Sequence, residues 1–327
     1  MEDITPSTYE NDKAVKAHDE YPFAIPATGL AEETHHPGHA EERETEMTAF
    51  LRFRHRFREP LAECLGTMVL VMFGDGVVAQ VKLSKGAAGD YTVIALSWAA
   101  AVMLGYMVSG GISGGHMNPA VTISAAVYRG FPKRKVIPYI LGQLLGGFIG
   151  AFLVYGIYVQ SINHYEGEGI RTVTGATATA GIFCTFPQPY LTTRGQFASE
   201  LTATALLQLG IFALTDPYNA PAGEIFPLGL FVLIYALGSS FGFQTGYALN
   251  MARDFAPRVA AVALGYGGDM FSVYDGYAWV PVVAPIIGGL LGGGLYDLFI
   301  YQGKESPVNK RNFGFSRTAK KQAPVQA

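Results

Sequence analysis

Charged residues and cysteines are both scarce in this chain of 327 residues. Charged side chains occupy 15% of the positions and hydrophobic ones 50%, whereas about a quarter of the residues in soluble domains are charged. Buried helices of a large soluble protein would need more charged surface than this, so the composition favours a membrane protein. The two cysteines, Cys64 and Cys184, allow at most one disulfide, which excludes a fold held together by several.

The first 50 residues differ from the rest, because they hold 12 of the 26 acidic side chains but only three Lys or Arg residues. Few of them are aromatic, so they cannot bury enough apolar surface to offset the entropy of ordering. We predict that residues 1–58 form a disordered, acidic, cytoplasmic tail that ends in a basic juxtamembrane segment. The tail lacks the features of a cleaved signal peptide. We expect its histidines, His35, His36 and His39, to be solvated rather than to bind a metal.

The remainder of the chain contains long apolar runs. A helix of about 20 apolar residues can cross the hydrocarbon layer of a bilayer. Six runs meet this requirement, and they predict an all-α membrane protein with six transmembrane helices. The runs lie near residues 60–81, 91–111, 135–159, 196–216, 227–245 and 279–301. We place the membrane domain at 59–303 and a cytoplasmic C-terminal tail at 304–327.

Basic residues predict the orientation, because Lys and Arg accumulate in cytoplasmic loops. The segment "LRFRHRFREP" precedes the first run, other basic residues stand between the second and third runs, and more follow the sixth. All three groups lie on one side if both termini are cytoplasmic. We therefore expect a multi-pass protein of the plasma membrane with both termini in the cytoplasm. The alternative role for the first basic segment is to anchor on anionic lipid headgroups.

Three landmarks recur in the same order along the chain. "AECLGT" with Glu63 opens the first run, and "ASELTAT" with Glu200 opens the fourth. "SGGHMN" and "TGYALN" follow later in each half, and the pattern GGxxG occurs in the third and sixth runs. The halves, at about 59–159 and 196–303, each contain three spans, so the second half enters the membrane from the opposite side. The sequence therefore predicts an inverted repeat.

Asn118 and Asn250 are each followed by an apolar run of about ten residues, which is too short to cross a bilayer. We predict that these runs are re-entrant half-helices, capped at their N-termini by the two asparagines. Half-helices that meet near the midplane bring two amide donors and two positive dipole ends together. Such a site orients the oxygen of water or an alcohol, repels cations and interrupts a proton-conducting chain of waters. The prediction is a pore for small neutral solutes.

With these features the sequence resembles the major intrinsic protein family, the aquaporins and aquaglyceroporins, over roughly residues 58–303. The resemblance implies an aquaporin-like bundle of six helices and two half-helices, assembled as a homotetramer with one pore per subunit. The residues that match the two family signatures are Asn118, Pro119 and Ala120, and Asn250, Met251 and Ala252. Met251 replaces the usual proline, and this variant resembles the second signature of fungal glycerol channels. We expect the GGxxG patterns to pack helices within one subunit, and a role at the subunit interface is compatible with this.

The resemblance also implies a four-residue selectivity filter made of Trp98, Gly238, Tyr247 and Arg253. Arg253 is expected to donate hydrogen bonds to solute oxygens and to repel cations, and the alternative is a salt bridge to Asp254. Trp98 and Tyr247 are expected to form an apolar wall. Water-selective relatives usually carry histidine where Gly238 stands, and the absence of a side chain there widens the ring. We therefore predict a passive channel for glycerol and other small uncharged solutes that also conducts water.

Four more residues are assigned supporting roles by the same likeness. Glu63 and Glu200 are expected to accept hydrogen bonds from the re-entrant loop of their own half, rather than to form a proton relay. Asp254 is expected to steady the loop that carries the arginine. His116 is expected to present its carbonyl or its ring to the cytoplasmic half of the pore.

Other functions are weighed against this one. A water channel that excludes glycerol is favoured by Tyr247 and Met251 and disfavoured by Gly238. A secondary active transporter can also use inverted repeats and broken helices, but the midplane here offers two asparagine donors instead of sites for coupling ions. An enzyme is disfavoured, because no phosphate loop, metal-ligand spacing or activated nucleophile occurs. We expect no cofactor, no metal and no nucleic-acid partner.

Overall fold

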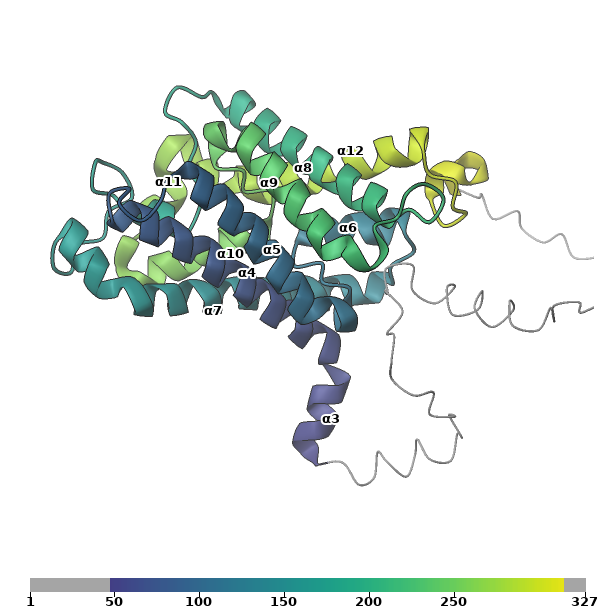
Figure 1. Cartoon of the computed structure of the whole chain (residues 1–327), viewed down its shortest axis with the longest axis horizontal. Helices are drawn as coiled ribbons and strands as arrows, with labels where there is room; N and C mark the ends of the chain where they lie inside the picture. The colour runs from purple at the N-terminus through teal and green to yellow at the C-terminus, as the bar shows by residue number, and fades with distance from the viewer. Residues whose placement is uncertain (1–47, 315–327) are drawn as a thin grey trace, which may run out of the picture.

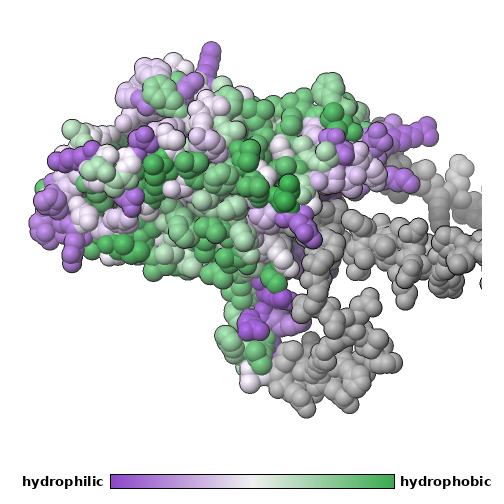
Figure 2. Space-filling view, viewed as in Figure 1, coloured by the Kyte–Doolittle hydropathy of each residue, from purple (hydrophilic) through white to green (hydrophobic). Residues whose placement is uncertain are grey.

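Long helices that run side by side make up most of the molecule (Figure 1). The computed structural model describes residues 48–314. Six of its helices are long and apolar enough to cross a membrane, so all six predicted runs are confirmed as helices. These are α4 (Arg58–Leu83), α5 (Tyr91–Ser113), α7 (Lys133–Glu166), α8 (Thr193–Thr215), α9 (Phe226–Thr245) and α12 (Val280–Phe299). Figure 2 shows the hydrophobic side chains as a broad band between two more hydrophilic ends.

The basic segment before the first span is a helix, α3 (Ala49–Arg56), which points away from the bundle (Figure 1). The Oγ1 atom of Thr48 caps it by accepting a hydrogen bond from Leu51 N at 3.3 Å. Basic side chains in its last turn also favour the helix, because they offset the negative end of its dipole. The prediction of disorder up to residue 58 is therefore wrong for this segment. Residues 1–47, with their three histidines, and 315–327 lie outside the described residues.

The two short runs after the asparagines are the half-helices α6 (Pro119–Tyr128) and α10 (Met251–Ala261). They lie inside the bundle and extend towards opposite ends of it (Figure 1). Each packs mainly on a spanning helix of the other repeat half, because α6 contacts α12 and α10 contacts α7. The inverted repeat thus folds as two interlocked halves rather than as two independent units.

The GGxxG patterns explain how these helices approach so closely. A Cβ atom on Gly146 would lie 2.1 Å from the Cys64 carbonyl oxygen of α4, and one on Gly147 would lie 2.3 Å from the Ala252 carbonyl oxygen of α10. The second half repeats this arrangement with Gly288 against α8 and Gly289 against α6. In each pair, one glycine admits the spanning helix of its own half and the next admits the half-helix of the other. The expected packing within one subunit is confirmed.

The basic segments gather at one end of the bundle. Lys135 Nζ lies 2.8 Å from Glu59 Oε1, which joins the start of α7 to the start of α4. Arg129, just after α6, binds Asp297 near the end of α12, with Nη2 and Oδ1 2.7 Å apart. The end of α6, the start of α7 and the last residues of α12 therefore share one end of the bundle with α3 (Figure 1).

Short elements complete the described residues, and both cysteines are free. At the end of the bundle away from α3, the loop between α7 and α8 carries a buried stretch near Thr179 and Phe183. The short elements are η1 (Ala180–Ile182), η2 (Gly223–Ile225), η3 (Val262–Tyr266), α11 (Asp269–Gly276), η4 (Tyr277–Trp279), η5 (Pro307–Asn309) and η6 (Arg311–Gly314).

Substitution of Gly146 by Ala tests the close packing of α7 on α4. The added methyl group meets backbone atoms that cannot move aside locally, so we expect the protein to lose about 1–3 kcal/mol of stability. The measurement is the apparent unfolding temperature in detergent. The matched control is Gly156→Ala on the same helix, where a Cβ atom meets nothing within 4 Å. Equal unfolding temperatures for the two variants would contradict the packing argument.

Candidate functional site

The two asparagines cap the half-helices in the same way. Oδ1 of Asn118 accepts a hydrogen bond from Ala120 N at 2.9 Å, and Oδ1 of Asn250 accepts one from Ala252 N at 2.8 Å. Both cap residues have extended backbone, with φ near −150°. Pro119 occupies the first helical position of α6, where its missing N–H is no loss. Met251 occupies that position in α10 without altering the cap.

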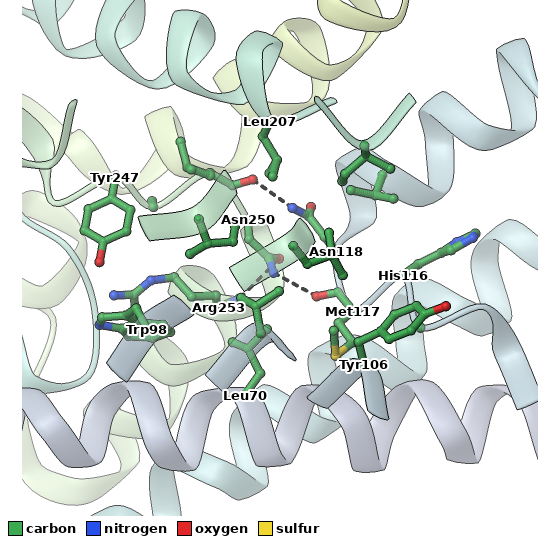
Figure 3. A pocket seen from close by; sticks show the side chains of 18 of the residues that line it. Leu70, Trp98, Tyr106, His116, Met117, Asn118, Leu207, Tyr247, Asn250 and Arg253 are labelled. Atoms are coloured by element: carbon green, nitrogen blue, oxygen red, sulfur yellow. Dashed lines mark hydrogen bonds between the residues drawn. The ribbon is translucent and has the colours of Figure 1, made fainter. Parts of the chain in front are cut away.

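The side chains of the two asparagines also join the half-helices to each other (Figure 3). Nδ2 of Asn118 donates to the Leu249 carbonyl at 2.9 Å, and Nδ2 of Asn250 donates to the Met117 carbonyl at 2.7 Å. Each asparagine therefore bonds the loop that leads to the other. An amide nitrogen carries two hydrogens, so one N–H of each side chain is left to bind a molecule between them.

The loops before the half-helices are strained and need support. Met117 and Leu249 have φ of 48° and 53°, a left-handed conformation that costs a non-glycine residue about 1–3 kcal/mol. Gly114, Gly115 and Gly246 adopt positive φ in the same loops, a conformation that glycine reaches without steric cost. Such irregular backbone persists within a membrane only where protein covers it or where it lines a water-filled cavity.

Buried carboxylates provide this support in both halves. Glu63 accepts hydrogen bonds from His116 N at 2.9 Å and Met117 N at 2.7 Å. Glu200 accepts them from Ala248 N at 3.0 Å and Leu249 N at 2.9 Å. These contacts match the supporting role expected for both residues.

Glu63 has further partners that the sequence analysis missed. Its carboxylate accepts hydrogen bonds from Ser113 Oγ at 2.6 Å and from Gln143 Nε2 at 2.7 Å. Gln143 also donates to Thr122 Oγ1 of α6 at 2.9 Å. A glutamine within an apolar run was the available signal, but its partner lies 80 positions away in the sequence.

A cavity of about 80 Å³ passes the paired asparagines. One water molecule needs about 10–15 Å³ by this measure, so the cavity holds several waters or a small polyol. One end is lined by Trp98, Tyr247 and Arg253, and we call it the arginine end. No Asp or Glu is among the described residues that line it. The apolar lining residues include Leu70, Val102, Val121, Leu207, Ile211 and Ile234.

At the arginine end, the guanidinium carbon of Arg253 lies 3.8 Å from the centre of a Trp98 ring, as Figure 3 shows. Both residues are largely buried, at 8% and 4% exposure. A guanidinium group stacked on an aromatic face is held in place by cation–π attraction. This end therefore combines hydrogen-bond donors with the apolar ring of Tyr247. Met251, the variant position of the second signature, is not among the residues that line the cavity.

Gly238 differs from its expected place, because it does not line the cavity. A Cβ atom on Gly238 would lie 3.0 Å from both Cζ and Oη of Tyr247. The tyrosine ring therefore occupies the space next to Gly238. Gly238 affects the cavity indirectly, because its lack of a side chain lets Tyr247 take this position. The Tyr247 hydroxyl is buried without a hydrogen-bond partner among residues 48–314.

Asp254 forms its salt bridge with Arg258, so the alternative of a salt bridge between Asp254 and Arg253 is not found. Oδ2 of Asp254 accepts hydrogen bonds from Thr185 N and Oγ1, both at 2.7 Å. Arg258 is fully buried and donates to the carbonyls of Thr185 and Met270, at 2.7 Å each. Asp254 thus holds the loop between α7 and α8 against α10. The i, i+4 spacing of Asp254 and Arg258 is the signal that could have indicated this pair.

His116 lies on the side of the asparagines away from Arg253 and lines the cavity (Figure 3). Its Nδ1 atom is 3.1 Å from Thr122 Oγ1, and its ring packs against Phe131 and Tyr139. The ring is therefore held in a fixed position beside the cavity. Among residues 48–314, no group of three or more His, Cys, Asp or Glu side chains is placed to hold a metal ion.

The chain has clear similarities to known proteins. Residues 51–296 match the family described as "Major intrinsic protein". The "Probable aquaglyceroporin-2" of Gibberella zeae is 50% identical over 273 residues, which cover 83% of this chain and 81% of that protein. The "Glycerol uptake/efflux facilitator protein" of Saccharomyces cerevisiae is 41% identical, over 77% of this chain and 43% of that protein. The X-ray structure of the aquaglyceroporin from Plasmodium falciparum superposes with a TM-score of 0.66 at 33% identity, covering 74% of this chain and 96% of that one.

Substitution of Glu200 by Ala tests the support of the second loop. Two buried N–H groups lose their acceptor, and each such loss costs about 1–3 kcal/mol. We expect a lower apparent unfolding temperature and a lower solute flux per folded channel. Glu200→Gln keeps one acceptor oxygen, so its unfolding temperature and flux are expected to lie between those of Glu200→Ala and the native protein. The control is Glu224→Ala, at an exposed position. If Glu200→Ala had the same unfolding temperature and flux as this control, the supporting role of Glu200 would be disproved.

Proposed function

The chain belongs to the major intrinsic protein family, and on this basis we propose that it is a passive channel for glycerol, other small uncharged solutes and water. The family consists of channels rather than enzymes, and six spanning helices make the chain an integral multi-pass membrane protein. We assign it no catalytic activity and no cofactor.

The arginine end is the observation that carries the proposal. Arg253 presents N–H donors beside the apolar rings of Trp98 and Tyr247. A linear polyol has hydroxyl groups along a carbon chain, so it can bind the donors while its carbons contact the rings. We propose that Trp98, Tyr247 and Arg253 form the selectivity filter, with Gly238 behind the tyrosine. The names of the relatives from Gibberella zeae and Saccharomyces cerevisiae agree with glycerol as a solute.

The paired asparagines support the exclusion of ions and protons. A solute between them meets an amide N–H from each half-helix and the positive ends of two helix dipoles. A water held there donates outward to its neighbours, so a proton cannot pass along the chain of waters. Cations meet the charge of Arg253, and the described lining offers them no carboxylate.

The setting of the channel follows from the same reasoning. We propose that the end of the bundle with α3 faces the cytoplasm, because the basic segments gather there. Both termini would then be cytoplasmic, and the arginine end of the cavity would face outward. We further propose a homotetramer in the plasma membrane, with one pore in each subunit.

Stopped-flow light scattering on proteoliposomes tests the solute. Shrinkage in an impermeant osmolyte measures water flow, and reswelling in glycerol measures glycerol flow. We expect both to exceed those of empty liposomes, with no dependence on a pH gradient or membrane potential. A high water flow with glycerol flow equal to that of empty liposomes would instead identify a water-selective channel. Coupling to either gradient would identify an active transporter.

The variant Gly238→His tests the filter. An imidazole at this position must displace the Tyr247 ring into the cavity. We expect glycerol permeability to fall by about tenfold or more, equivalent to about 1.4 kcal/mol of added barrier. The control is Gly181→His in the loop before α8, where a Cβ atom meets nothing within 4 Å. Unchanged glycerol permeability in a folded Gly238→His channel would refute this assignment of the filter.

A further inference from the structure

Asp75 is a buried acidic residue of α4 that lies behind the arginine end of the cavity. Its exposure is 0%, and neither carboxylate oxygen has a hydrogen-bond partner among the described residues. Its salt bridge is with Arg253, whose Nη1 atom lies 3.8 Å from Oδ1. A buried charge is costly unless an opposite charge offsets it, so Asp75 and Arg253 depend on each other.

The carboxylate next to Arg253 in the sequence is already engaged. Oδ1 of Asp254 accepts hydrogen bonds from Arg258 Nε at 3.0 Å and Nη2 at 2.9 Å. Oδ2 accepts two from Thr185. These four bonds use the lone-pair sites of the Asp254 carboxylate. Asp75 is therefore the acidic group that remains to offset the charge of Arg253.

Gly74, the residue before Asp75, determines the position of Trp98, the ring on which Arg253 stacks. A Cβ atom on Gly74 would lie 2.2 Å from Trp98 Cη2, so only glycine lets the indole ring reach α4. Arg253 lies over this ring, 3.8 Å from its centre. Two consecutive residues of α4 thus position the filter, Gly74 through contact with Trp98 and Asp75 through charge on Arg253.

Arg253 lines the cavity and Asp75 does not. Asp75 therefore cannot contact a solute, and it can act on one through its charge or through the position of the guanidinium group. The interior of a protein screens charge weakly, so a carboxylate at this distance reduces the positive potential that a solute meets. The carboxylate also attracts Nη1, the guanidinium nitrogen that lies 3.8 Å from Oδ1, and this attraction favours one orientation of the guanidinium group.

We propose that Asp75 is a positioning residue and countercharge for Arg253, and that it sets the preference of the constriction for polyols over water. This inference rests on the proposed role of Arg253 as the filter arginine. Without the carboxylate, the stack on Trp98 remains to hold the guanidinium group, and its orientation within that stack is less restricted. A polyol needs a fixed orientation more than water does, because several of its hydroxyl groups must be matched at once.

The test compares Asp75→Asn, which keeps the shape and removes the charge, with the native channel in proteoliposomes. We expect the ratio of glycerol to water permeability to fall about threefold or more, within the range of coupling energies between contacting residues. The control is Asp297→Asn, which breaks the buried pair with Arg129 at the opposite end of the bundle. It is expected to lower the unfolding temperature and to leave the permeability ratio unchanged.

A stability measurement tests the same pairing without relying on flux. In the native background, Asp75→Asn leaves Arg253 without its countercharge and is expected to lower the unfolding temperature. In an Arg253→Gln background, the native Asp75 is itself uncompensated, so Asp75→Asn is expected to raise that temperature. This reversal of sign distinguishes a charge pair from a packing role.

The outcomes separate the two proposals. An unchanged permeability ratio in folded Asp75→Asn, or a stability change of the same sign in both backgrounds, would overturn the role of Asp75 while glycerol flow through the native channel still supports the proposed function. Native channels that conduct no glycerol would overturn the proposed function, whatever the stability measurement shows.

Discussion

The exchange of hydrogen bonds between the two half-helices is the contact on which the rest of the membrane domain depends. Met117 and Leu249 line the cavity, and the carbonyl of each receives a hydrogen bond from the asparagine of the opposite half. Each re-entrant loop is therefore held both by its own half, through a buried carboxylate, and by the other half, through an asparagine. The glycines of α7 and α12 serve the same arrangement, because they let each half-helix lie against a spanning helix of the other repeat.

The buried charged residues of the membrane domain are also engaged in specific contacts. Glu63 and Glu200 are both fully buried, and each is used to hold backbone N–H groups of a loop. Asp254 and Arg258 join the long loop to α10. Arg253 is the charged residue of a different kind, since it lines the cavity. The acidic side chains do not line the cavity, so a solute meets hydrogen-bond donors and apolar side chains.

Much of this architecture could be predicted from the sequence, because the relevant signals are local or repeated. Six apolar runs gave the spans, and two short runs after asparagine gave the half-helices. The partners of charged residues were harder to predict, since they depend on contacts distant in the sequence. Asp75 stands within the first apolar run and was a visible anomaly, but its neighbour Arg253 lies in the other half. The contact between Gly238 and Tyr247 was missed because it is not visible from sequence spacing. The helix α3 was missed because the prediction of disorder was based on composition and did not consider Thr48 as a helix cap.

The inverted repeat has a consequence for the direction of transport. A molecule between Asn118 and Asn250 is offered the same pair of amide donors whether it arrives from one mouth or the other. The two mouths differ, since Arg253 lines one end and His116 lies towards the other, but a solute passes both in either direction, and this difference cannot drive net movement. Net movement through such a pore is decided by the concentrations in the two compartments. One protein can therefore serve a cell both when the solute is more concentrated outside and must be taken up, and when it is more concentrated inside and must be released quickly.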